Sequence, residues 1–333
     1  MKKVILSIII LTSLAACSQK EKNMLNQNKN ITADNIVEEL SKQVKHYPKE
    51  QAYFVSYDNE MCYFEILVND IPTFTNFNQP LSSSAFQVNP CIFKNGIQKI
   101  TYKLYPVGRT EYSEVDQTVF GKDTKLTLKI SVADNKQQEL QGDMINEFVT
   151  PITLTKDEYG NDIENFIATG KDYYEGSFTF EAKTPYELEG FENVQNLRKL
   201  DAKELQSKLI KQYANLKNVY QNKEYDNIAK ASYNSLRDQF IAEYETKENI
   251  QSIWEELMGA FKESSFEMQP VENYKMVFFA DGKLVALMQT TLDNRFRGNT
   301  ALWAKVNYGG GLRPMFLNSY FYIPKGKTEF EVY

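Results

Sequence analysis

The sequence predicts two folded units in series. The first, of the all-β class, is an antiparallel β-sandwich over residues 49–185, and the second is an α+β unit of three helices followed by an antiparallel sheet over residues 186–333. In the first unit apolar and polar residues alternate with a period of two, which indicates strands with one buried face. Near residue 200 the apolar period lengthens to that of a helix, and after residue 270 it returns to two. A chain of 333 residues is long enough for two domains.

About six to eight short strands with little helix between them favour a sandwich for the first unit. Residues 63–68 form a denser apolar run, typical of a strand that is covered on both faces. Asn95-Gly96 between Phe93 and Ile97 predicts a type I′ hairpin turn, because that turn needs positive φ at two positions. The clearest alternating segments lie at residues 99–104, 125–132 and 177–182.

The first helix of the second unit is predicted to begin at Asp201-x-x-Glu204, which has the form of a helix capping box with Asp in the place of Ser or Thr. Apolar stripes then predict three helices, and the short connection 221–223 makes the first two antiparallel. Asp281-Gly282 predicts a second hairpin turn. Helices followed by an antiparallel sheet form an α+β arrangement. The strands expected in this sheet are residues 274–279, 284–290, 301–308, 315–323 and 328–333.

Residues 1–16 have the pattern of a secretory signal peptide, with two lysines, a short apolar stretch and small residues at the end. Residues 14–17, Leu-Ala-Ala-Cys, resemble the lipobox of bacterial lipoproteins. The resemblance implies that residues 1–16 are removed and that Cys17 is acylated on its thiol and its new amino group, which anchors the protein in a membrane. With Ser18 after the cysteine, it further implies an outer-membrane protein facing the periplasm. The alternative is a secreted protein with a coincidental cysteine.

Residues 17–31 are expected to form a flexible tether, because Met24 and Leu25 are the only strongly apolar residues from 18 to 30. Residues 32–48 are expected to form one short helix capped by Thr32, outside both folded units. Its apolar face would consist of Ile36, Leu40 and Val44.

The composition excludes several classes of function. With 38 basic and 44 acidic residues, and a net charge of −8 once residues 1–16 are removed, the chain does not have the charge of a nucleic-acid binder. The one histidine, His46, lies in the predicted short helix, and none of the three cysteines has a C-x-x-C spacing. These counts argue against a His-based triad, a zinc ribbon and a thioredoxin-like site, and no cofactor is expected.

Cys62 and Cys91 remain once Cys17 is acylated, and both share strand parity with inward-facing phenylalanines. In an oxidising envelope they could form a disulfide across a loop of about 30 residues, which would stabilise the fold by roughly 3 kcal/mol. The alternative is two free thiols that pack as small apolar groups.

Two clusters are candidates for ligand binding. The acidic loop with Asp157, Asp162 and Glu164 has the oxygen ligands of a calcium site, but its spacing does not match an EF-hand, and a solvated hairpin loop is favoured. The second cluster combines arginines and aromatics, the residue types enriched at binding hot spots. The alternative there is core aromatics with arginines paired to acids. This second cluster comprises Arg295, Arg297, Trp303, Tyr308 and Arg313.

These observations favour a non-enzymatic envelope lipoprotein that binds another protein or an envelope polymer. An immunity lipoprotein that neutralises a delivered toxin is the first alternative, since an acidic protein associates rapidly with a basic one. A hydrolase with a carboxylate site in the second unit is the other alternative, although no carboxylate pair can be named from the sequence.

Overall fold

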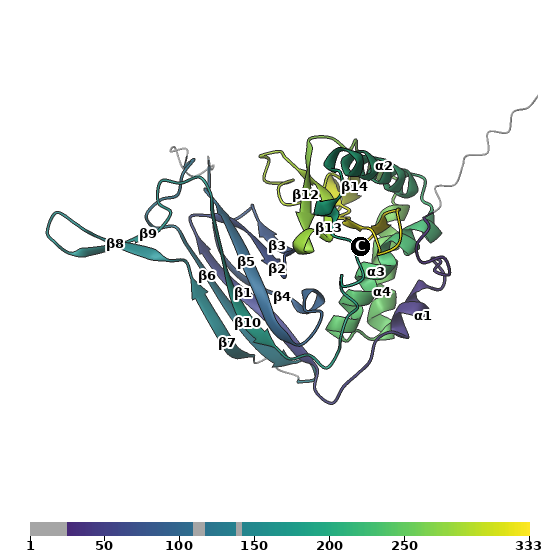
Figure 1. The fold of residues 1–333 in the computed structure, drawn as a ribbon, viewed down its shortest axis with the longest axis horizontal. Helices are drawn as coiled ribbons and strands as arrows, with labels where there is room; N and C mark the ends of the chain where they lie inside the picture. Colours follow the sequence, from purple (N-terminus) through teal and green to yellow (C-terminus); the bar gives the residue numbers. More distant parts are fainter. Residues whose placement is uncertain (1–24, 109–116, 138–141) are drawn as a thin grey trace, which may run out of the picture.

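The computed structural model describes residues 25–108, 117–137 and 142–333. Its β-rich unit is a sandwich of two four-stranded antiparallel sheets, on the left in Figure 1. The first sheet contains, in spatial order, β4 (Leu81–Gln87), β1 (Gln51–Glu60), β6 (Lys125–Asp134) and β7 (Asp143–Val149). The second contains β10 (Tyr174–Ala182), β5 (Gly96–Tyr105), β2 (Tyr63–Val68) and β3 (Ile71–Asn76).

The apolar side chains that alternate with polar ones along β5 and β6 point inward and fill the space between the two sheets. Tyr102 of β5 also meets Phe148 of β7, with ring centroids 4.7 Å apart. The predicted fold class, a sandwich followed by a helix-and-sheet unit, is confirmed. The inward residues of β5 and β6 that are fully buried are Ile100, Leu104, Leu126, Leu128 and Ile130.

The hairpin predicted at Asn95-Gly96 is wrong. Gly96 has a positive φ of 119°, but it opens β5, while the preceding strand β4 pairs with β1 in the other sheet. A 3-10 turn (Asn89–Cys91) lies on the path between the two sheets. The Asn95 side chain accepts a hydrogen bond from the backbone N–H of Thr184, so this asparagine serves a long-range contact and not a hairpin turn.

The helices of the second unit begin as predicted. The Asp201 carboxylate accepts a hydrogen bond from the Glu204 N–H at 2.8 Å, the bond that caps the first helix. Asp281 and Gly282 lie at positive φ in the turn between two paired strands, as predicted. The helices are α2 (Ala202–Gln221), α3 (Tyr225–Glu243) and α4 (Lys247–Lys262).

The strands after these helices form two antiparallel sheets, whereas the sequence predicted one. A single bridge between Met288 and Thr300 links the two sheets, because the loop 290–299 carries the chain away from the first. One sheet contains β12 (Tyr274–Phe279), β13 (Leu284–Gln289), β16 (Phe321–Tyr322) and β17 (Glu331–Val332). The other contains β11 (Glu267–Met268), β14 (Trp303–Tyr308) and β15 (Gly311–Phe316).

The projecting hairpin in Figure 1 pairs β8 (Ile152–Lys156) with β9 (Asp162–Phe166).

The expected short helix is shorter than predicted and is not separate from the folded units. Only α1 (Ile36–Ser41) is helical within residues 32–48, and the chain then turns so that Tyr47 packs edge-on against Tyr244. Ile36 and Leu40 are fully buried in the core that the three long helices share. This segment therefore belongs to the helical layer, although it precedes the sandwich in sequence.

The tether predicted for residues 17–31 does not extend to residue 31. Leu25 and Ile31 are buried in the same helical core, so residues 25–31 are packed and fixed. The earlier part of the predicted tether, the signal peptide and Cys17 lie outside the described residues.

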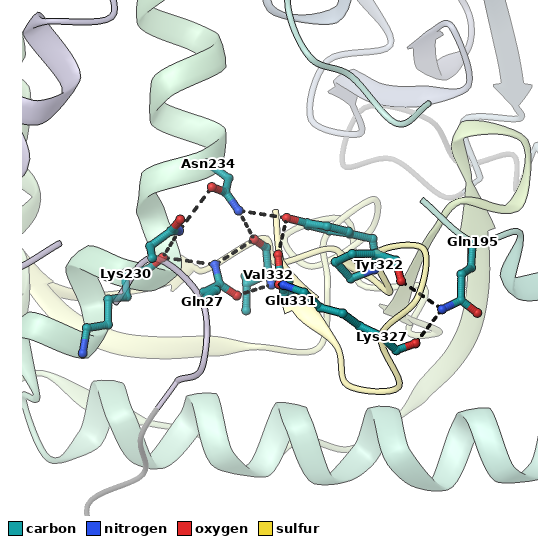
Figure 2. Close-up of polar contacts among 10 residues, drawn as sticks. Gln27, Gln195, Lys230, Asn234, Tyr322, Lys327, Glu331 and Val332 are labelled. Carbon is teal, nitrogen blue, oxygen red and sulfur yellow. Dashed lines mark hydrogen bonds and ion pairs between the residues drawn. The ribbon is translucent and has the colours of Figure 1, made fainter. Parts of the chain in front are cut away.

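Figure 2 shows how this N-terminal segment is held by polar contacts. The Gln27 side-chain amide donates to the carbonyl of Val332 at 3.1 Å and accepts from the Val332 N–H at 2.6 Å, as a neighbouring strand would. It also donates to the carbonyl of Lys230 in α3. Gln27 thus joins the segment 25–31 to both β17 and α3.

Strand β13 lies between the helices and the sandwich (Figure 1) and is covered on both faces. Val285 and Leu287 belong to the helical core, whereas Leu284 and Ala286 belong to the same apolar cluster as the sandwich interior. The dense run predicted to be a doubly covered strand, β2, is indeed buried at five of its six positions. The two units are therefore packed tightly on each other.

None of the helices in the described ranges is both long and apolar enough to cross a membrane.

We expect Gln27→Ala to lower the free energy of unfolding by about 1–3 kcal/mol, because it leaves the buried N–H of Val332 without its partner and removes one of the two side-chain donors to the Val332 carbonyl, the other being Asn234. Denaturant unfolding followed by circular dichroism measures this. Gln43→Ala, at an exposed position near α1, is the matched control and should change stability by less than about 0.5 kcal/mol. Equal unfolding midpoints for the two variants would show that the hydrogen bonds of the Gln27 side chain contribute nothing to stability.

Candidate binding cleft

A cavity of about 270 Å³ lies where the second sandwich sheet meets the C-terminal unit. The sandwich contributes residues of β2, β3 and β5, and the other unit contributes β12, β13 and the loop 290–298. Pockets between domains are common sites for ligands. The polar and charged residues of its lining are Glu65, Thr75, Lys103, Tyr105, Lys275, Gln289, Thr290, Thr291 and Arg297.

Arg297 is the residue that joins the two walls of the cleft. Its guanidinium carbon lies 4.1 Å from the ring centroid of Phe77 and 4.9 Å from that of Tyr105, both in the sandwich. Stacking over aromatic faces suits the planar guanidinium and leaves its edge free for hydrogen bonds. Next to it, Gly298 lies at φ +77°, where a Cβ atom would be 2.7 Å from the Thr75 methyl group. A glycine therefore allows the loop to approach β3 closely.

The Arg297 guanidinium is half-buried, and burial lowers its pKa, an effect that nearby Tyr105 and Glu65 oppose. One of its donors reaches the side-chain oxygen of Asn294 at 3.2 Å. Among the described residues, no carboxylate comes within 4.0 Å of this guanidinium. A desolvated cation without an ion-pair partner attracts an anion more strongly than a solvated one does.

Two lysines add positive charge to the cleft. Within the described chain, neither Lys103 nor Lys275 has an ion-pair partner within 4.0 Å. Glu65, the only carboxylate that the described residues contribute to the lining, accepts a hydrogen bond from the Tyr105 hydroxyl at 3.2 Å. Burial and this carboxylate raise the pKa of Tyr105, so its phenol stays protonated at neutral pH. The lining thus carries three cations and one anion in a protein whose net charge is −6.

The structure disperses the predicted arginine and aromatic cluster. Of its four members whose side chains the structure describes, only Arg297 lines the cleft. Arg295 is exposed and forms a two-pronged ion pair with Asp293, as the alternative interpretation expected. Trp303 packs against Phe296, with ring centroids 5.0 Å apart.

The two remaining members belong to the other end of the β14–β15 hairpin. Arg313 is exposed there and pairs in register with Val306. Tyr308 lies at the end of β14, and its side chain is outside the described part of the structure. The four members with described side chains do not form one site.

The acidic loop is the turn of the projecting β8–β9 hairpin. The Asp157 carboxylate accepts hydrogen bonds from the N–H groups of Tyr159 and Asn161, which stabilise the turn itself. Asp162 pairs with Lys156, and Glu164 lies opposite Leu154. In the described ranges, no group of three His, Cys, Asp or Glu residues is arranged to hold a metal ion. The loop has the conformation of a solvated hairpin.

Cys62 and Cys91 are two separate free thiols, so the disulfide alternative is wrong for this structure. The Cys62 sulfur lies 3.6 Å from the carbonyl oxygen of Lys125, and the Cys91 sulfur lies 3.4 Å from the Thr73 hydroxyl. Burial raises the pKa of Cys62 to about 12 and that of Cys91 to about 11. Both thiols are therefore protonated and unreactive at neutral pH.

A second, wider hollow of about 530 Å³ lies between the units around Gly190 and Asp281. Four carboxylates and two lysines line it. One of these lysines, Lys94, is already paired with Glu192 at 2.6 Å. Its lining carries more carboxylates than lysines, so it lacks the excess of cations found in the first cavity and is the weaker candidate for an anionic ligand.

The sequence alone does not identify three lining residues of the cleft as site candidates, namely Lys103, Lys275 and Tyr105. Lys103 and Tyr105 occupy the outward positions of an alternating strand, where polar residues are expected to face water. That outward face is instead covered in part by the second unit, and no local pattern indicates this.

We expect iodoacetamide at pH 8 to leave Cys62 and Cys91 unmodified in the native protein and to alkylate both after unfolding in guanidinium chloride. The reason is that pKa values of about 12 and 11 leave almost no thiolate at pH 8, and burial blocks access. Mass spectrometry of the peptides measures the modification. A linked peptide pair containing both cysteines, or rapid alkylation of the native protein, would contradict the structure.

Comparison of the chain with protein-family models, with curated proteins and with solved structures found no match.

Proposed function

We propose that the protein is a lipoprotein of the bacterial cell envelope, acylated at Cys17 and facing the periplasm from the outer membrane. Its role is to bind another protein or an envelope polymer, not to catalyse a reaction. The observation that carries the binding role is the cleft between the two units, where Arg297 is half-buried and has no carboxylate partner in the described chain. The anchor rests on the lipobox resemblance of residues 14–17.

The chemistry of the cleft supports binding more than hydrolysis. A glycosidase of the carboxylate type needs two acidic groups on either side of the scissile bond. The cleft lining contains one, Glu65, and its hydrogen bond with Tyr105 fixes it at the wall. Three cations against one anion suit the recognition of a negatively charged group, and such complementarity favours both specificity and rapid association.

Acylation is tested by metabolic labelling with palmitate in a bacterial host. We expect the wild-type protein to be labelled and to sediment with membranes, and Cys17→Ser to lose the label, because the thiol is the site of diacylation in the lipobox resemblance. Cys62→Ala is the matched control, since its thiol is buried, and it should remain labelled. A labelled Cys17→Ser protein would contradict the anchor.

The binding role is tested by in vivo cross-linking and capture of the intact protein. We expect a discrete partner with the wild type and a loss of about tenfold or more with Lys103→Gln/Arg297→Gln, because the variant removes two cations of the cleft. Arg295→Gln is the control, since this arginine is exposed, pairs with Asp293 and does not line the cleft.

Equal capture by both variants would place the interface elsewhere, and no partner with the wild type would contradict the binding role. A captured basic toxin would favour the immunity lipoprotein over a structural role in the envelope.

A further inference from the structure

We infer that the cleft between the units binds a unit of about the size of one sugar ring that carries a carboxylate or a phosphate. The inference rests on the proposed function and specifies its ligand. The volume, the charge and the polar groups of the lining each contribute to it.

The size of the cavity limits the ligand. Pockets that hold drug-sized molecules measure about 300–1,000 Å³. The cleft, at about 270 Å³, lies just below that range, so it accommodates one ring or one short side chain of a longer chain. An open rim allows the rest of a polymer to continue outside.

The charge of the cavity selects an anion. Arg297 comes from the loop 290–298, Lys275 from β12 and Lys103 from β5, so the three cations approach from both units. The stacking of Arg297 on Phe77 and Tyr105 holds its guanidinium in one orientation, which reduces the entropy lost on binding. The guanidinium donors that do not bond to Asn294 match both carboxylate and phosphate oxygens.

The remaining polar groups suit hydroxyls. Among the described residues, the Thr75 hydroxyl and the Gln289 amide make no hydrogen bond of their own, and both line the cavity. Val277 and Phe279 provide an apolar wall on the C-terminal side. A few hydrogen-bonding groups beside an apolar wall are the usual environment of a small polar ring.

The test is isothermal titration calorimetry of the full-length acylated protein in detergent with three probes that share one ring. Glucuronic acid carries a carboxylate, glucose 6-phosphate carries a phosphate, and glucose carries neither. We expect heat of binding with one or both anionic probes and none with glucose. The anionic probe with the lower Kd identifies whether the cleft prefers a carboxylate or a phosphate. Binding should weaken as salt is raised from about 50 to 300 mM, because partly exposed charges are screened.

Lys103→Gln/Lys275→Gln should weaken the binding of the anionic probe about fivefold or more, because two ion pairs are lost. Lys99→Gln removes the same charge from the same strand outside the cavity and should leave binding unchanged. The lysine variants avoid the stacked Arg297, whose replacement could also loosen the contact between the units. Unfolding curves of each variant confirm that it is folded.

Equal binding of glucose, or no effect of the double lysine variant, would overturn the inference. If no probe binds although the cross-linked partner is captured, the ligand class is wrong and the proposed binding role remains. If neither is seen, both are wrong.

Discussion

The architecture depends on the burial of β13 on both of its faces. Val285 and Leu287 pack against the helices, and Leu284 and Ala286 pack against the sandwich, so one strand serves two apolar cores. Every one of these four side chains is fully buried, and truncation of Leu284 or Leu287 to alanine would cost about 2–5 kcal/mol. The contact between the units is consequently part of the fold and not a loose docking of two domains.

This contact creates the cleft. Because β12 and β13 cover only part of the outer face of the second sandwich sheet, the uncovered part forms one wall of the cavity and the loop 290–298 forms another. Gly298 allows the loop to approach β3, and Arg297 then reaches the aromatic rings of the sandwich. The position of the guanidinium therefore follows from the packing of the two units.

Local patterns in the sequence predicted the parts of the fold that local physics decides. Alternation identified β5 and β6, the density of apolar residues showed that β2 is covered twice, and Asp201 marked the start of α2. The prediction of a hairpin at Asn95-Gly96 was wrong because the residue types of a turn do not specify which strands pair. The preceding strand, β4, pairs with β1 in the other sheet. The docking of residues 25–31 has no periodic apolar signal, because only Leu25 and Ile31 are buried apolar anchors there and the hydrogen bonds of Gln27 to Val332 and Lys230 complete the attachment. The cleft could be predicted only in part: Arg297 has the residue type of a binding site, but Phe77 and Tyr105, which orient it, lie far away in the sequence.

The docking of Gln27 on β17 has a mechanical consequence. A pulling force applied through the residues before Leu25 would load the hydrogen bonds between Gln27 and Val332 first, together with the buried side chains of Leu25 and Ile31. The force would then pass into the helical layer, which contacts the sandwich through β13 and also through Tyr244, whose hydroxyl donates to the carbonyl of Gln51 in β1. The helical layer, and not the sandwich, is thus the first part of the fold to receive tension from the residues before Leu25.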